Sequence, residues 1–113
     1  MGADRLLIDL AVELKAELRK GGIHEAHLDA KGWHLDGLCD HASGQVYVDP
    51  APSIVESLLH EVIHRRFPRW GEKRVDATAK RLLRSMNSHQ VRWWYRQFQA
   101  RKTTLTTPVN ADK

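Results

Sequence analysis

Cysteine is almost absent from this chain, and long apolar runs are missing altogether. Its only cysteine, Cys39, has no partner for an internal disulfide bond, which fits a reducing compartment. No stretch approaches the roughly 18 consecutive apolar residues that a membrane span needs. The N-terminus does not have the pattern of a secretory signal peptide. We therefore expect a cytoplasmic protein without membrane association.

The length and composition favour one compact domain. Hydrophobic residues make up 42% of the 113 positions and charged residues 28%, which is close to the globular average and argues against extensive disorder. The threonine-rich, polar C-terminal end is typical of a frayed terminus. We expect a single compact domain over residues 1–102 and a flexible tail over 103–113. The sequence does not indicate an oligomeric state.

Positive charge exceeds negative charge, which raises the question of a nucleic-acid partner. The formal net charge is +4, and much of the excess lies between Arg65 and Arg101. Aromatic residues 93–95 lie between Arg92 and Arg96, and such residues can stack on nucleobases. Helical spacing favours another interpretation, in which Trp94 and Tyr95 pack in the core, Trp93 points elsewhere and both arginines face solvent. Nucleic-acid binding thus remains the less favoured alternative.

Hydrophobic periodicity and turn residues predict an α+β fold. An amphipathic helix over 5–19 ends at Gly21-Gly22. Three short strands with a turn at 41–44 form a small antiparallel sheet, and three further helices follow. Ser53 and Glu56 have the spacing of a capping box at the start of the first of these helices. The predicted strands are 23–28, 33–39 and 45–49, and the later helices are 53–67, 72–86 and 89–101.

The sequence His60-Glu61-Val62-Ile63-His64 lies inside the predicted helix 53–67. Residues four apart share one helical face, so the two imidazoles project together and can bind one metal ion. Glu61 is rotated by about 100° from His60, so its carboxylate can act on a water at the metal without being a ligand. The alternative is a coincidental pair of surface histidines.

A catalytic zinc site needs three protein ligands and one open position. The next predicted helix offers Glu72 and Asp76, which share a helical face with apolar residues and are expected to be buried. Glu72 is the expected third ligand, although it could instead be a first-turn acid stabilised by the helix dipole. Asp76 is expected to orient a ligating histidine, or else to pair with Lys80 or Arg101. His89 is a fallback ligand.

His60-Glu61-x-x-His64 followed by Glu72-x-x-x-Asp76 resembles the gluzincin zinc metallopeptidases, in particular the single-domain minigluzincins and the small ImmA/IrrE-like or phage-encoded peptidases. The resemblance implies a zincin-like fold, Zn²⁺ as cofactor and Glu72 as third ligand. It also implies that a sheet edge binds the peptide as an added strand, for which Val46–Val48 (Val46, Tyr47, Val48) is the candidate.

We therefore expect a zinc metalloendopeptidase that hydrolyses protein or peptide substrates with Glu61 as general base. Tyr47, His34 and Tyr95 are candidates for stabilising the oxyanion. The alternative is a phage-related module that binds nucleic acid or protein and has a structural or vestigial metal site. A Cys39–His41 metal site is disfavoured, because the spacing matches no zinc-finger pattern.

Overall fold

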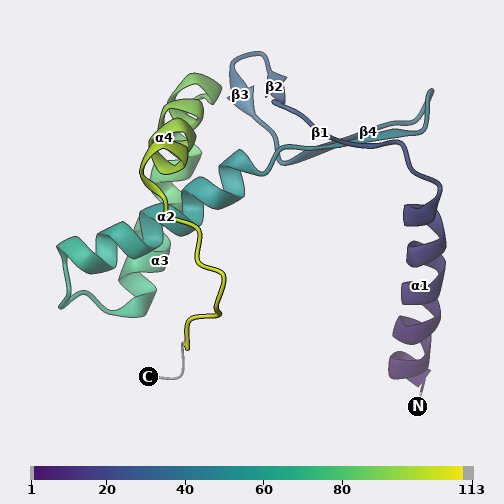
Figure 1. Ribbon diagram of the computed structural model, residues 1–113, viewed down its shortest axis with the longest axis horizontal. Coiled ribbons are helices and arrows are strands. Elements are labelled where there is room, and N and C mark those ends of the chain that lie inside the picture. Colours follow the sequence, from purple (N-terminus) through teal and green to yellow (C-terminus); the bar gives the residue numbers. More distant parts are fainter. Residues whose placement is uncertain (1, 111–113) are drawn as a thin grey trace.

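The computed structural model describes residues 2–110, and Figure 1 shows how their helices and strands are arranged. In chain order the elements are α1 (Gly2–Arg19), β1 (Ile23–Glu25), β2 (Asp29–Ala30), β3 (Trp33–His34), β4 (Gly37–Asp40), β5 (Gln45–Val48), α2 (Ala51–Arg66), α3 (Glu72–Ser85) and α4 (Ser88–Arg101). The predicted α+β class is confirmed. Strands are shorter than predicted, and the expected strand 33–39 is divided between β3 and β4.

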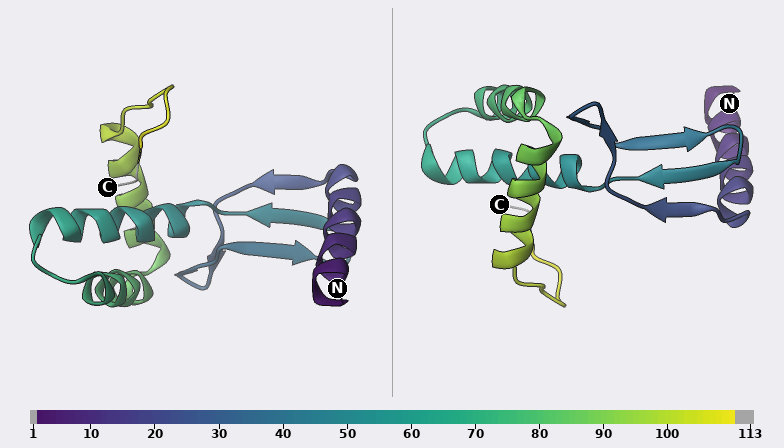
Figure 2. Two further views of the ribbon diagram at one scale, coloured as in Figure 1. Left: turned by 90° about the horizontal axis from the view of Figure 1, so that it is seen from below. Right: turned by 90° about the horizontal axis from the view of Figure 1, so that it is seen from above.

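Strand β5 is the centre of a three-stranded sheet with the order β1-β5-β4 (Figure 2). β4 is antiparallel to β5, and the predicted turn connects the two strands. Gly44 in this turn has a φ of +73°. β1 instead runs parallel to β5, so the prediction of a purely antiparallel sheet is wrong. A parallel pair needs a long crossover, and residues 26–44 supply it with the β2-β3 ladder and β4.

The central position of β5 excludes one predicted substrate site. Its backbone pairs with β1 on one side and with β4 on the other. No free edge remains on β5 for an additional strand. The prediction that Val46, Tyr47 and Val48 bind substrate as an edge strand is therefore wrong.

Helices α2, α3 and α4 surround the hydrophobic core. Four buried α2 residues recur every four positions, which turns one face of that helix inward. α3 and α4 pack against this face. The buried members of the core are Ala51, Val55, Leu59, Ile63, Val75, Ala79, Met86 and Val91.

Asp49 joins the sheet, α2 and α4 at one buried point. Its side chain is 3% exposed. Oδ1 accepts a hydrogen bond from the backbone N–H of Ala51 at 3.0 Å, and Oδ2 accepts one from the N–H of Leu28 at 3.0 Å. The Arg92 guanidinium donates to Oδ2 at 2.5 Å. The expectation that Arg92 faces solvent is therefore wrong.

Helix α2 starts two residues earlier than predicted. It begins at Ala51, so Ser53 and Glu56 lie within the helix and do not form the expected capping box. Pro52 fits the first turn, where a backbone N–H has no helical partner, and the Asp49 carboxylate satisfies the N–H of Ala51. A capping box does occur at the start of α4, between Asn87 and Gln90.

Helix α1 stands apart from the other helices, beyond the far end of the sheet (Figures 1 and 2). It ends before Gly21 and Gly22, whose φ angles are +76° and +70°. The radius of gyration is 17.8 Å, compared with about 13 Å for a compact chain of this length. The prediction of one compact domain over 1–102 is therefore wrong for this helix.

Residues 102–110 contain no helix or strand, in keeping with the described part of the predicted tail. Residue 1 of the predicted domain and residues 111–113 of the predicted tail lie outside the described residues. Within 2–110, no helix is both long enough and apolar enough to cross a membrane.

We predict that Asp49→Asn lowers the free energy of unfolding by about 2–4 kcal/mol, because it leaves the partly buried Arg92 charge without its counter-ion. Urea denaturation followed by circular dichroism measures the change. Asp36→Asn, on an exposed residue nearby in the chain, serves as the control and should be neutral. Equal stability of the two variants would contradict the role of Asp49.

Candidate metal centre

His60 and His64 project from one face of α2, as the motif predicts. They follow the buried Leu59 and Ile63 by one residue each, so they lie at the border of the core-facing side. Their ring centroids are 4.9 Å apart. The buried row thus fixes the position of the two imidazoles on the half-buried flank of the helix.

Glu72 joins these histidines from the first turn of α3. One carboxylate oxygen, Oε1, lies 2.5 Å from Nε2 of His60, and the other, Oε2, lies 3.1 Å from Nε2 of His64. The three side chains therefore meet at one point, although twelve residues separate His60 from Glu72. Within residues 2–110, this is the group of three metal-ligating side chains that the fold brings together.

The donor set fits a transition metal such as zinc. Two imidazole nitrogens and one carboxylate are a common zinc-binding combination that leaves a fourth position open. One ligand atom from each residue lies within 4.8 Å of the others. Tetrahedral ligands about 2.1 Å from zinc are roughly 3.4 Å apart. Small side-chain shifts would therefore suffice to hold the ion.

The electrostatics of the group favour a cation. Hydrogen bonds from His64 and then from His60 lower the pKa of Glu72 below its ordinary value. Its carboxylate therefore stays ionised over the neutral range. The Glu72 side chain is 73% exposed, so the site opens to solvent. An ion and a ligand can reach it without opening of the core.

The helical-wheel expectation for α3 is wrong in one respect. Glu72 and Asp76 were expected on a buried face, whereas their side chains are 73% and 49% exposed. Only Val75 and Ala79 of this helix are buried, so the apolar face is narrower than predicted. The two carboxylates lie at its edge, where they reach α2 without the cost of full burial.

Asp76 forms the expected ion pair with Lys80 and lies near His60 without a hydrogen bond to it. Oδ1 lies 3.8 Å from Nδ1 of His60, which is ion-pair range but longer than a hydrogen bond. Oδ2 accepts a hydrogen bond from Nζ of Lys80 at 3.0 Å. Lys80 therefore holds the carboxylate beside His60, where a small rotation would let it accept from Nδ1.

Glu61 lies on the solvent side of α2, one residue after His60. It is exposed, and within residues 2–110 its carboxylate forms no ion pair or side-chain hydrogen bond. It borders a shallow hollow between α2 and α4 with Ser57, Leu58 and Phe98. The carboxylate is thus free to interact with water or a ligand in this hollow.

Other sequence-predicted candidates lie elsewhere. Tyr47 stacks on His24 within the sheet, and His34 contacts the backbone oxygen of Leu83 at 3.3 Å. Tyr95 packs against the helical core. None of the described metal-ligating groups includes Cys39, His41 or the fallback ligand His89.

The loop between α2 and α3 positions Glu72, and the sequence interpretation missed its role. Phe67 and Trp70 stack with ring centroids 4.3 Å apart. The Arg74 guanidinium lies 3.7 Å from the centre of the Trp70 ring. These contacts tie the loop to the first turn of α3. In the sequence, the aromatic residues Phe67 and Trp70 on either side of Pro68 were the feature that could have indicated an ordered loop.

Neither the sequence nor the fold of this chain matches a known protein: no family model, no curated protein and no solved structure matches the chain. The chemistry of the site therefore has to be argued from its own residues.

We predict that the purified protein binds one zinc ion, and that His60→Ala, His64→Ala and Glu72→Ala each abolish or greatly weaken binding. Each change removes one of the three converging ligands. Metal analysis after dialysis measures the stoichiometry. His89→Ala is the matched control and should retain the ion. Wild-type protein that holds no zinc after reconstitution would refute the site.

We predict that Asp76→Ala weakens zinc binding by about tenfold or more, because it removes the acceptor beside Nδ1 of His60. Competition with a chromophoric chelator measures the affinity. Lys80→Ala frees the same carboxylate and should bind zinc at least as tightly as wild type. Unchanged affinity in Asp76→Ala would show that this residue serves only the ion pair with Lys80.

Proposed function

We propose that this chain is a zinc-dependent peptidase that uses Glu61 as general base. The observation that supports it most strongly is the meeting of His60, His64 and Glu72, with both carboxylate oxygens next to imidazole nitrogens. An acid that is not a ligand follows the first histidine directly. A purely structural metal site has no need of such a base.

A zinc ion held by these three ligands would polarise a scissile carbonyl and lower the pKa of a neighbouring water. The protein's own part is then positioning and proton transfer. Glu61 accepts a proton from the attacking water and later delivers it to the leaving amine. Its exposed carboxylate has no partner among the described side chains that would compete for this role.

Open access to the site supports the proposed substrate class. Glu72 is exposed, and Glu61 borders an open hollow with apolar walls from Ile54, Leu58 and Phe98. Such an open site can receive an extended polypeptide. We therefore propose protein or peptide substrates and a zincin-like, gluzincin-type arrangement, in keeping with the resemblance in the motif.

The test compares zinc-loaded wild type with Glu61→Gln on a disordered protein and on a mixed fluorogenic peptide library. We predict that the variant retains one zinc and loses at least about 100-fold in kcat/KM, as expected for loss of a general base. Glu25→Gln, an exposed substitution in β1, is the control.

Two results would refute this proposal. One is full hydrolytic activity in zinc-loaded Glu61→Gln. The other is wild-type protein that holds zinc but cleaves none of these substrates, or cleaves them equally well after chelation.

A further inference from the structure

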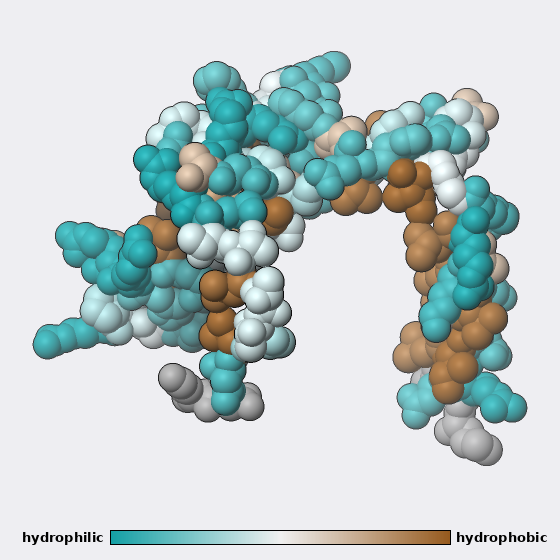
Figure 3. All heavy atoms as spheres, in the orientation of Figure 1, coloured by the Kyte–Doolittle hydropathy of each residue, from teal (hydrophilic) through white to brown (hydrophobic). Residues whose placement is uncertain are grey.

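Helix α1 carries an apolar stripe that the other residues described by the structure do not cover. The stripe consists of Leu6, Leu7, Leu10, Leu14 and Leu18, which are between 47% and 70% exposed. Figure 3 shows these apolar residues along the side of α1 that faces the open space beside the helical core. α1 has no extensive contact with any other described element.

An exposed apolar stripe of this size is expected to pack against another surface. A single helix of 18 residues is only marginally stable in water, and helices gain most of their stability from packing of the apolar face. Large contiguous apolar patches on folded proteins usually mark interaction sites. The stripe is thus one half of an interface.

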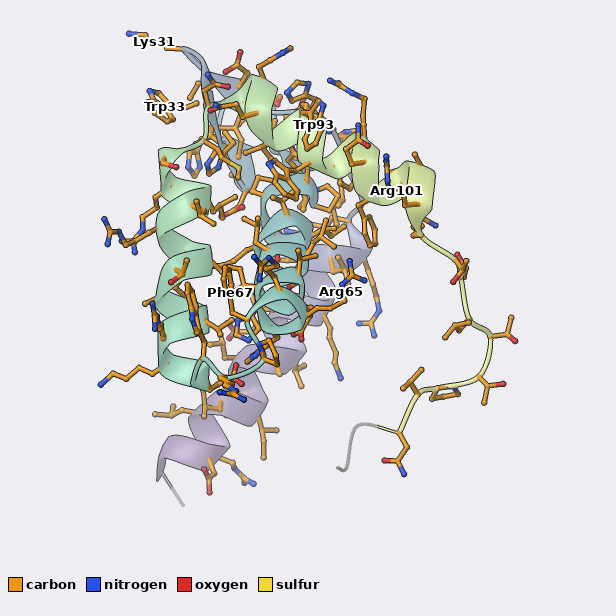
Figure 4. The ribbon with its side chains drawn as sticks, turned by 90° about the vertical axis from the view of Figure 1, so that its left-hand side faces the viewer. Lys31, Trp33, Arg65, Phe67, Trp93 and Arg101 are labelled. Carbon is orange, nitrogen blue, oxygen red and sulfur yellow. The ribbon has the colours of Figure 1, made fainter. Side chains whose placement is uncertain are left out.

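The helical core offers a groove of matching character between α2 and α4. Its apolar walls are Leu58, Val62, Trp93, Trp94 and Phe98, and its volume is about 470 Å³. Its polar rim contains Arg65, Arg101 and Lys102. In Figure 4, Arg65 marks the α2 side of this groove, and Trp93 and Arg101 mark the α4 side.

The charges that border the two surfaces are complementary. Asp9, Glu13 and Glu17 recur every four residues on α1 and therefore form an acidic row along one flank of the stripe. The groove has three cationic side chains at its rim. Glu17 also pairs with Lys20 at 2.7 Å, but both side chains are exposed and such pairs are weak.

The connection to the sheet directs α1 away from its own groove. The N–H of Gly21 donates to the oxygen of Leu18, and the oxygen of Gly22 accepts from the N–H of Val46. The end of the helix is therefore fixed to the first residues of the sheet. α1 joins one end of the sheet, and α2 joins the other end (Figure 1).

We propose that α1 of one copy docks its apolar stripe into the α2/α4 groove of a second copy, and that the second copy returns the same contact. The acidic row then faces the basic rim. Two reciprocal contacts of a helix about 27 Å long bury on the order of 1,000 Å². This is near the lower limit for specific interfaces, so the dimer should dissociate on dilution.

Docking would also add a wall near Glu61. Leu58 and Phe98 line both the α2/α4 groove and the hollow beside Glu61. A helix in the groove would therefore lie beside the hollow that Glu61 borders. The dimer itself does not depend on the proposed peptidase activity.

The test is sedimentation equilibrium of the full chain between about 1 and 200 μM. Wild type should change reversibly from monomer to dimer. Two charge-reversal variants should each dimerise at least about tenfold more weakly: Asp9→Lys/Glu13→Lys/Glu17→Lys, and Arg65→Glu/Arg101→Glu/Lys102→Glu. Arg81→Glu/Arg84→Glu, on α3 outside the groove, is the control.

Mixing the two charge-reversal variants separates exchange between copies from a contact within one chain. In the mixed dimer, reversed helix meets reversed groove and the other contact is wild type, so dimerisation should recover. Recovery also shows that both variants are folded. A wild-type chain that stays monomeric at every concentration, or variants whose mixture dimerises no better than either alone, would overturn the proposal.

Discussion

The buried carboxylate of Asp49 is the interaction on which the arrangement of the helices depends. It receives hydrogen bonds from the segment after β1, from the first turn of α2 and from Arg92 of α4. A buried charge is stable only when it is paired and hydrogen-bonded, so these three segments must meet at this point. Asp49 thereby sets where α2 begins and where α4 packs against α2.

Helix α2 then serves three purposes with three faces. The row from Ala51 to Ile63 forms the core, and the histidines beside that row meet Glu72 of α3. The next face carries Glu61 and continues into the surface against α4. Because neighbouring faces are only about 100° apart, the metal centre, the base and the α2/α4 groove are parts of one continuous surface.

Much of the local structure could be predicted from the sequence. The spacing of His60 and His64, the turn at Gly44 and the end of α1 at Gly21 depend on residues close together in the chain. The parallel pairing of β1, the burial of Arg92 and the exposure of Asp76 depend on distant segments. Periodicity carries no information about such contacts, so these expectations were absent or wrong.

The sequence by itself determined the helices, the two-histidine motif and the α+β class, because helical period and turn chemistry are local properties. The tertiary structure decided that Glu72 lies next to the two histidines, that β5 is the central strand and that the apolar face of α1 is exposed. Each of these depends on the packing of segments a dozen or more residues apart. The stacked rings of Phe67 and Trp70 in the α2–α3 loop and the positive φ angles of Gly21 and Gly22 before β1 contribute to that packing.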